Sequence, residues 1–306
     1  MPRIRQYDRY FSEGLTASPL ERLDHETIVT IHAAVTPQNI DLPAYRSKKV
    51  EVDSTTLTAL RIADRTHQEV KCLLPYGSGN RKAEVIYTEG ESWAREEIQH
   101  ALAMEHANDS HFKMNKHVLA FQAGNCGEHA AIAYALLARH TIAAPVRFVA
   151  DLHKDHGYVT IGDCRDRRWG EKNTVVVDAW VSHPSACTLA HSKYDGAGMT
   201  AFERSVNAPP DPDAEIADVD HIGSDTVNSL LSASGLPPIG EQLLHHVYAL
   251  KRHTPLMKPT KSVAKDPSTR YTDNRVTSGE TMDHIALSTV QRQRAAEDHC
   301  QTSFYR

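Results

Sequence analysis

Three residues of this chain, Cys126, His156 and Asp178, have the side chains that nucleophilic catalysis requires. A cysteine attacks as its thiolate, which is favoured at the N-terminus of a helix or beside an imidazolium. A histidine can take up the thiol proton, and a carboxylate can hold the imidazole in the orientation that this transfer needs. Such chemistry requires local structure that brings the three side chains together.

Cys126 stands in the stretch GNCGEHAAIAYALLARH, which predicts a helix over 126–139. Gly124 and Asn125 resist continuing this helix backwards, so the thiol is expected at the helix N-terminus. Gly127 carries no side chain and is expected to let a substrate approach the sulfur. The alternative is a buried thiol that packs against the strands, which is the commoner fate of a free cysteine.

Three strand-like runs follow the helix, namely VRFVADL (146–152), HGYVTIG (156–162) and NTVVVDAWV (173–181). One helix followed by an antiparallel meander is typical of an α+β fold. If the last two runs form a hairpin centred near Arg167, His156 lies directly opposite Asp178, close enough for the carboxylate to hold the imidazole. A slip of one residue would place the two side chains on opposite faces of the sheet.

Asp178 interrupts an otherwise apolar strand, where a lone carboxylate would be costly to bury. A histidine partner explains its presence, and the alternative is that Asp178 ends the strand and faces water. His153 competes with His156 for this role. In the same register, however, His153 would face Val181, which offers no polar group, so His156 is the preferred base.

A zinc site is a competing use of the same residues. Cys126 and His129 form a Cys-x-x-His pair, and Cys164 is nearby in the sequence. No second tight Cys/His pair occurs at ligand spacing, so no metal is expected. The sequence also lacks a Walker-type phosphate loop and a Rossmann fingerprint, and no cofactor is expected.

The flanking segments predict further elements and a division into three regions. Helices are expected at 18–35, 54–70, 88–106, 112–120, 224–234 and 240–252, and a short strand at 83–87. Thr88 and Glu91 have the spacing of a capping box for the third helix. The polar tail beyond 253 is expected to pack loosely or to be partly disordered. The expected regions are an N-terminal α/β region (1–90), a core (91–205), and C-terminal helices with the tail (206–306).

Composition limits the classes of partner. The 306 residues suffice for one large domain or two modest ones, and the net charge of −5 gives no reason to expect nucleic-acid binding. No run reaches the roughly 18 apolar residues of a membrane span, and no secretory leader or myristoylation signal is evident at the start. The five cysteines are few and odd in number, which favours reduced, cytosolic thiols over disulfides.

The blocks GNCGEHA, HGYVTIG and VVVDAW together resemble the transglutaminase-like superfamily of papain-fold cysteine enzymes, over about 93–181. The resemblance implies a catalytic helix packed on an antiparallel sheet, with Cys126 as nucleophile, His156 as base and Asp178 as the orienting carboxylate. Within the superfamily, NCGEHA and VVDAWV most resemble the HopX/AvrPphE group of plant-pathogen type III effectors. This implies a protein made in the bacterial cytoplasm and delivered into a host cell without a cleavable signal peptide, with 1–90 recognising a host target.

The expected activity is acyl transfer on a protein substrate. The thiolate attacks an amide carbonyl, and the backbone N–H of Cys126 with the side-chain amide of Gln122 holds the oxyanion. Water as the acceptor gives a protease or deamidase, and an amine gives a transglutaminase. The alternative is a catalytically inactive binding or scaffold protein that retains the fold.

Overall fold

The computed structural model describes residues 49–105, 111–181, 184–214, 216, 219–250, 263–266 and 269–273. Helices and antiparallel strands occur in separate runs along these segments, so the expected α+β class is confirmed. The expected helix at 18–35 lies outside the described residues.

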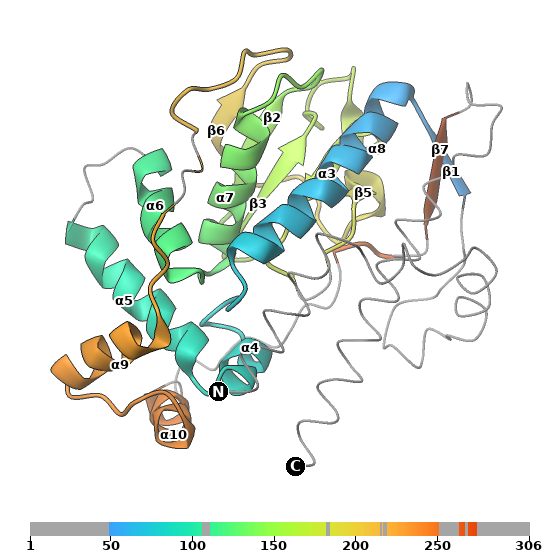
Figure 1. Ribbon diagram of the computed structural model, residues 1–306. Helices are drawn as coiled ribbons and strands as arrows, with labels where there is room; N and C mark the ends of the chain where they lie inside the picture. The colour runs from blue at the N-terminus through green and yellow to red at the C-terminus, as the bar shows by residue number, and fades with distance from the viewer. Residues whose placement is uncertain are drawn as a thin grey trace, which may run out of the picture.

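The main sheet has five antiparallel strands in the order β5-β4-β3-β2-β6 (Figure 1). They are β2 (Val146–Asp151), β3 (His156–Ile161), β4 (Val175–Val177), β5 (Cys187–Thr188) and β6 (Met199–Arg204). The first three form the expected meander, but β4 is shorter than the expected run at 173–181. Asp178 therefore lies just beyond the end of β4 instead of inside it.

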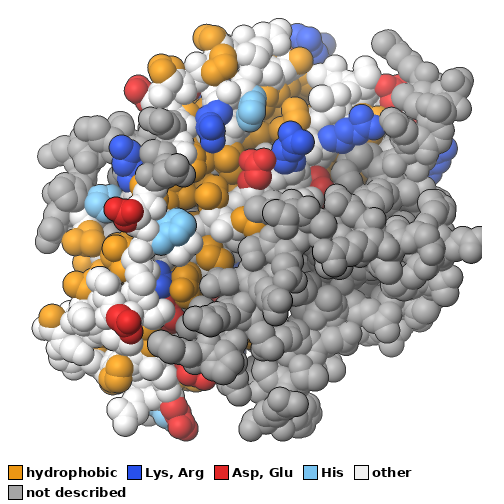
Figure 2. All heavy atoms as spheres, in the orientation of Figure 1, with side chains coloured by type: hydrophobic (Ala, Val, Ile, Leu, Met, Phe, Trp, Pro, Cys, Tyr) orange, Lys and Arg blue, Asp and Glu red, His pale blue; other side chains and the backbone are white. Residues whose placement is uncertain are grey.

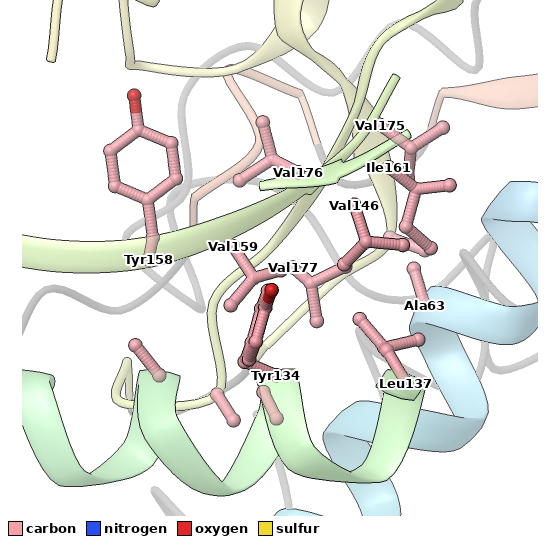
Figure 3. Close-up of a cluster of buried hydrophobic side chains, with 14 of the residues drawn as sticks. Ala63, Tyr134, Leu137, Val146, Tyr158, Val159, Ile161, Val175, Val176 and Val177 are labelled. Carbon is pink, nitrogen blue, oxygen red and sulfur yellow. The ribbon is translucent and has the colours of Figure 1, made fainter. Parts of the chain in front are cut away.

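Two helices, α3 (Ser54–Leu73) and α7 (Cys126–Ala138), pack against the main sheet (Figure 1). Figure 3 shows Leu137 of α7 and Ala63 of α3 facing Val159 and Val177 of the sheet, and all four are almost completely buried. The alanines of α7 let its backbone approach the strands closely, and the valines fill the space between. Removing this apolar surface from water holds the helix that begins at Cys126 in place.

A second, smaller core joins helices on the other side of α7. It contains Val85, Trp93, Ala94, Val227, Leu231, Leu243 and Val247. These residues come from α4 (Lys82–Tyr87), α5 (Glu91–Glu105), α9 (Ser224–Ala233) and α10 (Glu241–Leu250). Together with α6 (His111–Phe121) these make five helices, of which α6, α9 and α10 agree with the sequence prediction to within two residues at each described end, and α5 begins three residues later than expected.

The exception is α4, because 83–87 is a helix and the expected strand is wrong. An apolar run of five residues does not distinguish the two by periodicity, and here Val85 is buried in the helical core. The expected capping box after it forms only in part. The hydroxyl of Thr88 accepts from the N–H of Ser92 at 3.0 Å, but Glu91 pairs with Arg95 at 2.7 Å.

Part of the polar tail belongs to the fold. Strand β7 (Arg270–Asp273) pairs in parallel with β1 (Lys49–Val52), and Tyr271 is almost completely buried in the main core. The expectation of a loosely packed tail is therefore wrong for these residues, and most of the remaining tail lies outside the described residues. A buried tyrosine that follows a charged residue gives little apolar pattern to detect.

The three expected regions remain a prediction, but α3 of the first region shares the main core with α7 of the second. Short elements complete the fold, namely α8 (Gly170–Asn173) and the 3₁₀ helix η2 (Leu189–His191). Figure 2 shows acidic and basic side chains interspersed on this face of the molecule. None of the described helices is both long enough and apolar enough to cross a bilayer.

Candidate active site

Cys126 is the first residue of α7, as the sequence predicts. A complete capping box holds this end of the helix. The side chain of Asn125 accepts from the N–H of Gly127 at 2.8 Å, and Glu128 accepts from the N–H of Asn125 at 2.8 Å. The thiol is half-buried and lies where the helix dipole favours negative charge. Among the described residues, no group accepts a hydrogen bond from the backbone N–H of Cys126.

Gly124 has a steric role that the sequence alone did not indicate. A Cβ at this position would lie 2.4 Å from Cβ of Glu128 and 2.9 Å from its Cγ. The glycine therefore leaves room for the capping glutamate. Two backbone hydrogen bonds, from Tyr76 to Gln122 and from Gly124 to Gly77, fix the loop that leads into the helix.

Gly127 and Gly157 let the tip of α7 approach the beginning of β3. A Cβ on Gly157 would lie in ordinary contact with Cα of Gly127, at 3.5 Å, so the two backbones are separated by about the width of a methyl group. This close contact places Cys126 beside the strand whose first residue is His156. The expected role of Gly127 in admitting substrate stays a prediction, and a Cβ at this position would meet only Oδ1 of Asn125, at 3.2 Å.

His156 and Asp178 form the expected pair. The Nε2 atom of His156 lies 2.9 Å from Oδ2 of Asp178, and the side chains are 8% and 1% exposed. Burial by itself lowers the pKa of His156, but hydrogen bonds with Asp178 and Cys126 outweigh it and raise that pKa to about 10. Because Nε2 faces Asp178, Nδ1 is the ring nitrogen that remains for the sulfur. The sulfur of Cys126 lies 3.8 Å from the carbonyl oxygen of Asp155, the residue before His156, so the thiol stands next to the start of β3 that carries the imidazole.

The expected register of this hairpin is wrong by two residues. Val177 pairs with Val159, so the strand position opposite His156 would fall two residues beyond Asp178. An even shift keeps side chains on the same face, which is why the pair still meets. Asp178 reaches His156 from just beyond the last paired residue of β4, diagonally across the strand ends.

Asp178 is buried, and both carboxylate oxygens and its backbone N–H form hydrogen bonds. Its Oδ1 accepts from the N–H of Trp180 at 3.0 Å, and its Oδ2 accepts from the hydroxyl of Tyr194 at 2.5 Å as well as from His156. Its own N–H donates to Nε2 of His67 at 3.0 Å. Burial alone would raise the pKa of Asp178, but these hydrogen bonds and His156 keep it below its ordinary value. The carboxylate is therefore ionised near neutral pH, and the alternative of a water-facing Asp178 is wrong.

Two further residues named in the sequence analysis, Gln122 and His153, lie outside the pair of His156 and Asp178. Gln122 ends α6 in a left-handed conformation with φ of 56°, and its side-chain amide bonds to no other described residue. Its role at the oxyanion stays a prediction. His153 is exposed, and only its backbone N–H is bonded, to Asp151.

His129, the other half of the Cys-x-x-His pair, points into the protein. Its Nδ1 contacts the carbonyl of Asn125 at 2.8 Å, and burial together with Lys71 lowers its pKa to about 3. In the described part of the chain, no three His, Cys, Asp or Glu side chains gather in a way that could hold a metal ion. Cys164 instead lies 3.9 Å from the carbonyl of Gly196.

Three residues around the pair were not predicted: His67, Trp180 and Tyr194. The Trp180 ring lies 5.1 Å from that of His156, and its indole N–H donates to Ser78 at 3.0 Å. Trp180 belongs to the VVVDAW block and could have been noticed there. His67 on α3 and Tyr194 in a loop carry no local signal, because only the folded chain brings them to Asp178.

Comparison with protein-family models, with curated proteins and with solved structures gives no match to this chain.

Proposed function

We propose that this chain is a cysteine-dependent acyl-transfer enzyme of the transglutaminase-like, papain-fold type. The observation that supports this most directly is the 2.9 Å pair of His156 with the buried Asp178, at the strand end beside which Cys126 stands on a capped helix N-terminus. A nucleophile, a base and a third group that orients the base are the parts that covalent catalysis on an amide requires. The substrate in this proposal is a protein, and the resemblance to type III effectors favours a host protein.

The reaction proceeds through a thioester. The Cys126 thiolate attacks the amide carbonyl carbon, the carbon–nitrogen bond breaks, and the leaving nitrogen takes the proton from His156. Water or an amine then attacks the thioester while His156 takes up its proton, and the thiolate leaves. The developing oxyanion is held by the N–H of Cys126 and by Gln122. Asp178 stabilises the imidazolium that accompanies the thiolate before the first attack, and again when His156 takes up the proton of the second nucleophile.

The first test is the reactivity of Cys126 toward iodoacetamide at pH 6, read for each cysteine by mass spectrometry. An ordinary thiol is less than about 1% ionised at this pH, so a thiolate–imidazolium pair should react up to about a hundredfold faster. Cys164, half-buried like Cys126, serves as the internal reference, whereas Cys72 and Cys187 should hardly react because burial raises the pKa of each thiol to about 12. If all cysteines react at similar rates, the proposal fails.

Two variants make this test specific. His156→Gln should reduce the labelling of Cys126 to the rate of an ordinary thiol, because the thiolate loses its cation. His153→Gln is the matched control, since His153 is exposed three residues away, and it should leave the rate unchanged. Equal effects of the two substitutions would show that His156 does not activate the sulfur.

The class of reaction is tested with casein as a general glutamine-containing substrate. Incorporation of a fluorescent primary amine indicates transamidation, release of ammonia indicates deamidation, and new N-termini indicate proteolysis. Cys126→Ala must abolish whichever signal is found. A highly reactive Cys126 combined with full biological effect of Cys126→Ala would instead indicate a binding protein.

A further inference from the structure

We propose that Tyr194 is a positioning residue of this site, whose hydroxyl fixes the Asp178 carboxylate in the orientation that serves His156. The inference rests on the proposed function, because it gives Tyr194 a role in the same site. The Tyr194 hydroxyl would touch neither the substrate nor the sulfur and would act through Asp178, while the ring, which lies 5.6 Å from that of His156, is kept in a phenylalanine variant.

The contacts of Asp178 explain why it needs such a residue. Asp178 follows the last paired residue of β4, so no strand partner holds its backbone, and its N–H is bonded to His67 instead. Trp180 holds Oδ1 through a backbone N–H, whereas Tyr194 and His156 share Oδ2. Removing the tyrosine hydroxyl leaves His156 as the only donor to Oδ2. The orientation of the carboxylate then depends on His156, although the carboxylate is the group that should orient His156.

Tyr194 is itself firmly placed. Its ring stacks on Tyr158 with centroids 4.4 Å apart and an angle of 16°, and Nζ of Lys154 lies 5.7 Å above it. Its backbone N–H donates to the hydroxyl of Ser192 at 3.1 Å, and Ser192 forms a β-bridge with Ala264. The loop between η2 and β6 is therefore anchored on both sides, and the hydroxyl has a fixed position.

The hydroxyl stays protonated, and so remains a donor, across the pH range of the test below, because burial and the neighbouring Asp178 raise the pKa of Tyr194. It therefore always favours the ionised carboxylate over the protonated acid. Without it, Asp178 takes up a proton more readily as the pH falls. A neutral Asp178 no longer stabilises the imidazolium, and the thiolate form of Cys126 is then lost at a higher pH than in the wild type.

The test is the rate of Cys126 alkylation by iodoacetamide between pH 5 and pH 9 in the Tyr194→Phe variant. We expect a decrease of about tenfold at pH 6, as for loss of one hydrogen bond to a charged group. At pH 9, where thiols in general ionise, the rate should equal that of the wild type. Tyr158→Phe is the matched control, because its hydroxyl is buried in the same stack and bonds to no other described residue. Its profile should follow the wild type.

A double-mutant comparison separates positioning from general damage to the fold. In an Asp178→Asn background, Tyr194→Phe should not change the rate at pH 6 any further, because its partner is no longer ionised. A wild-type pH profile in Tyr194→Phe, or an equal decrease at pH 6 and pH 9, overturns the role of Tyr194. If Cys126 of the wild-type protein is nevertheless reactive, the proposed function still stands. An unreactive wild-type Cys126 overturns both.

Discussion

Substitution of Gly124 by alanine should destabilise the protein far more than one added methyl group suggests. The new Cβ would lie 2.4 Å from Cβ of Glu128 and 2.9 Å from its Cγ, distances that side chains do not tolerate. The Cβ of Glu128 is fixed by the helix backbone, so the side chain cannot simply rotate away. Either the loop before α7 or the first turn of α7 must move.

The expected cost follows from two contributions. Forcing an extra carbon into a packed site costs about 1–3 kcal/mol. Displacing Glu128 also breaks its 2.8 Å hydrogen bond with the N–H of Asn125, and loss of a helix cap costs about 1 kcal/mol. The free energy of unfolding should therefore fall by about 2–4 kcal/mol. Cys126 should also lose reactivity at pH 6, because the helix end that carries it is displaced.

Urea unfolding of a double-mutant cycle measures this directly. The cost of Gly124→Ala should fall below about 0.5 kcal/mol in a Glu128→Gly background, because the atom that it strikes has been removed. Gly157→Ala is the control, since its Cβ would have ordinary contacts of 3.5 Å and 3.6 Å, and it should cost less than about 1 kcal/mol. A Gly124→Ala protein as stable as the wild type, or an equal cost in both backgrounds, would refute the steric argument.

Two further predictions concern pH and the C-terminal tail. The pKa of His156 is raised to about 10, so its pairing with Asp178 contributes stability that is complete below the unfolded value of about 6.5 and is lost as the pH rises toward 10. The excess stability of the wild type over His156→Gln, measured by urea unfolding, should therefore decrease from pH 6.5 to pH 10, and a constant difference would contradict the pairing. Tyr271→Phe should cost about 1–3 kcal/mol, because the buried N–H of Thr188 loses its acceptor at 3.2 Å, whereas the exposed Tyr248→Phe should cost almost nothing. Equal stability of these two variants would mean that the tail does not support the core.

The sequence predicts the position of the nucleophile well, because the helix signal is local. Gly124 and Asn125 before an uninterrupted helical run place Cys126 at the helix tip, and the structure agrees. The meeting of His156 and Asp178 was also predicted, although the register was wrong by two residues. The alternation of side chains along a strand determines which face of the sheet each residue occupies. A shift of two residues leaves that face unchanged, so the pair was predicted correctly without the register.

The remaining parts of the site depend on contacts between distant segments, which no local pattern contains. His67 is more than a hundred residues from Asp178, and it reaches the site only because α3 packs beside β4. Tyr194 lies in a loop whose anchor, the bridge from Ser192 to Ala264, comes from the tail. The helix at 83–87 was missed for a different reason, since its apolar run is too short for periodicity to decide.

The parallel pair β1–β7 has a consequence for the order in which the chain folds. Its strands are about 220 residues apart, and closing so long a loop is slow compared with forming the hairpins of the main sheet. During synthesis, β1 leaves the ribosome about 220 residues ahead of β7 and cannot pair with it before then. The helix, hairpin and strand end that carry Cys126, His156 and Asp178 all lie between these strands. From contact order we therefore expect the pairing of β1 with β7 to follow the formation of the β2–β3 and β3–β4 hairpins that position the site.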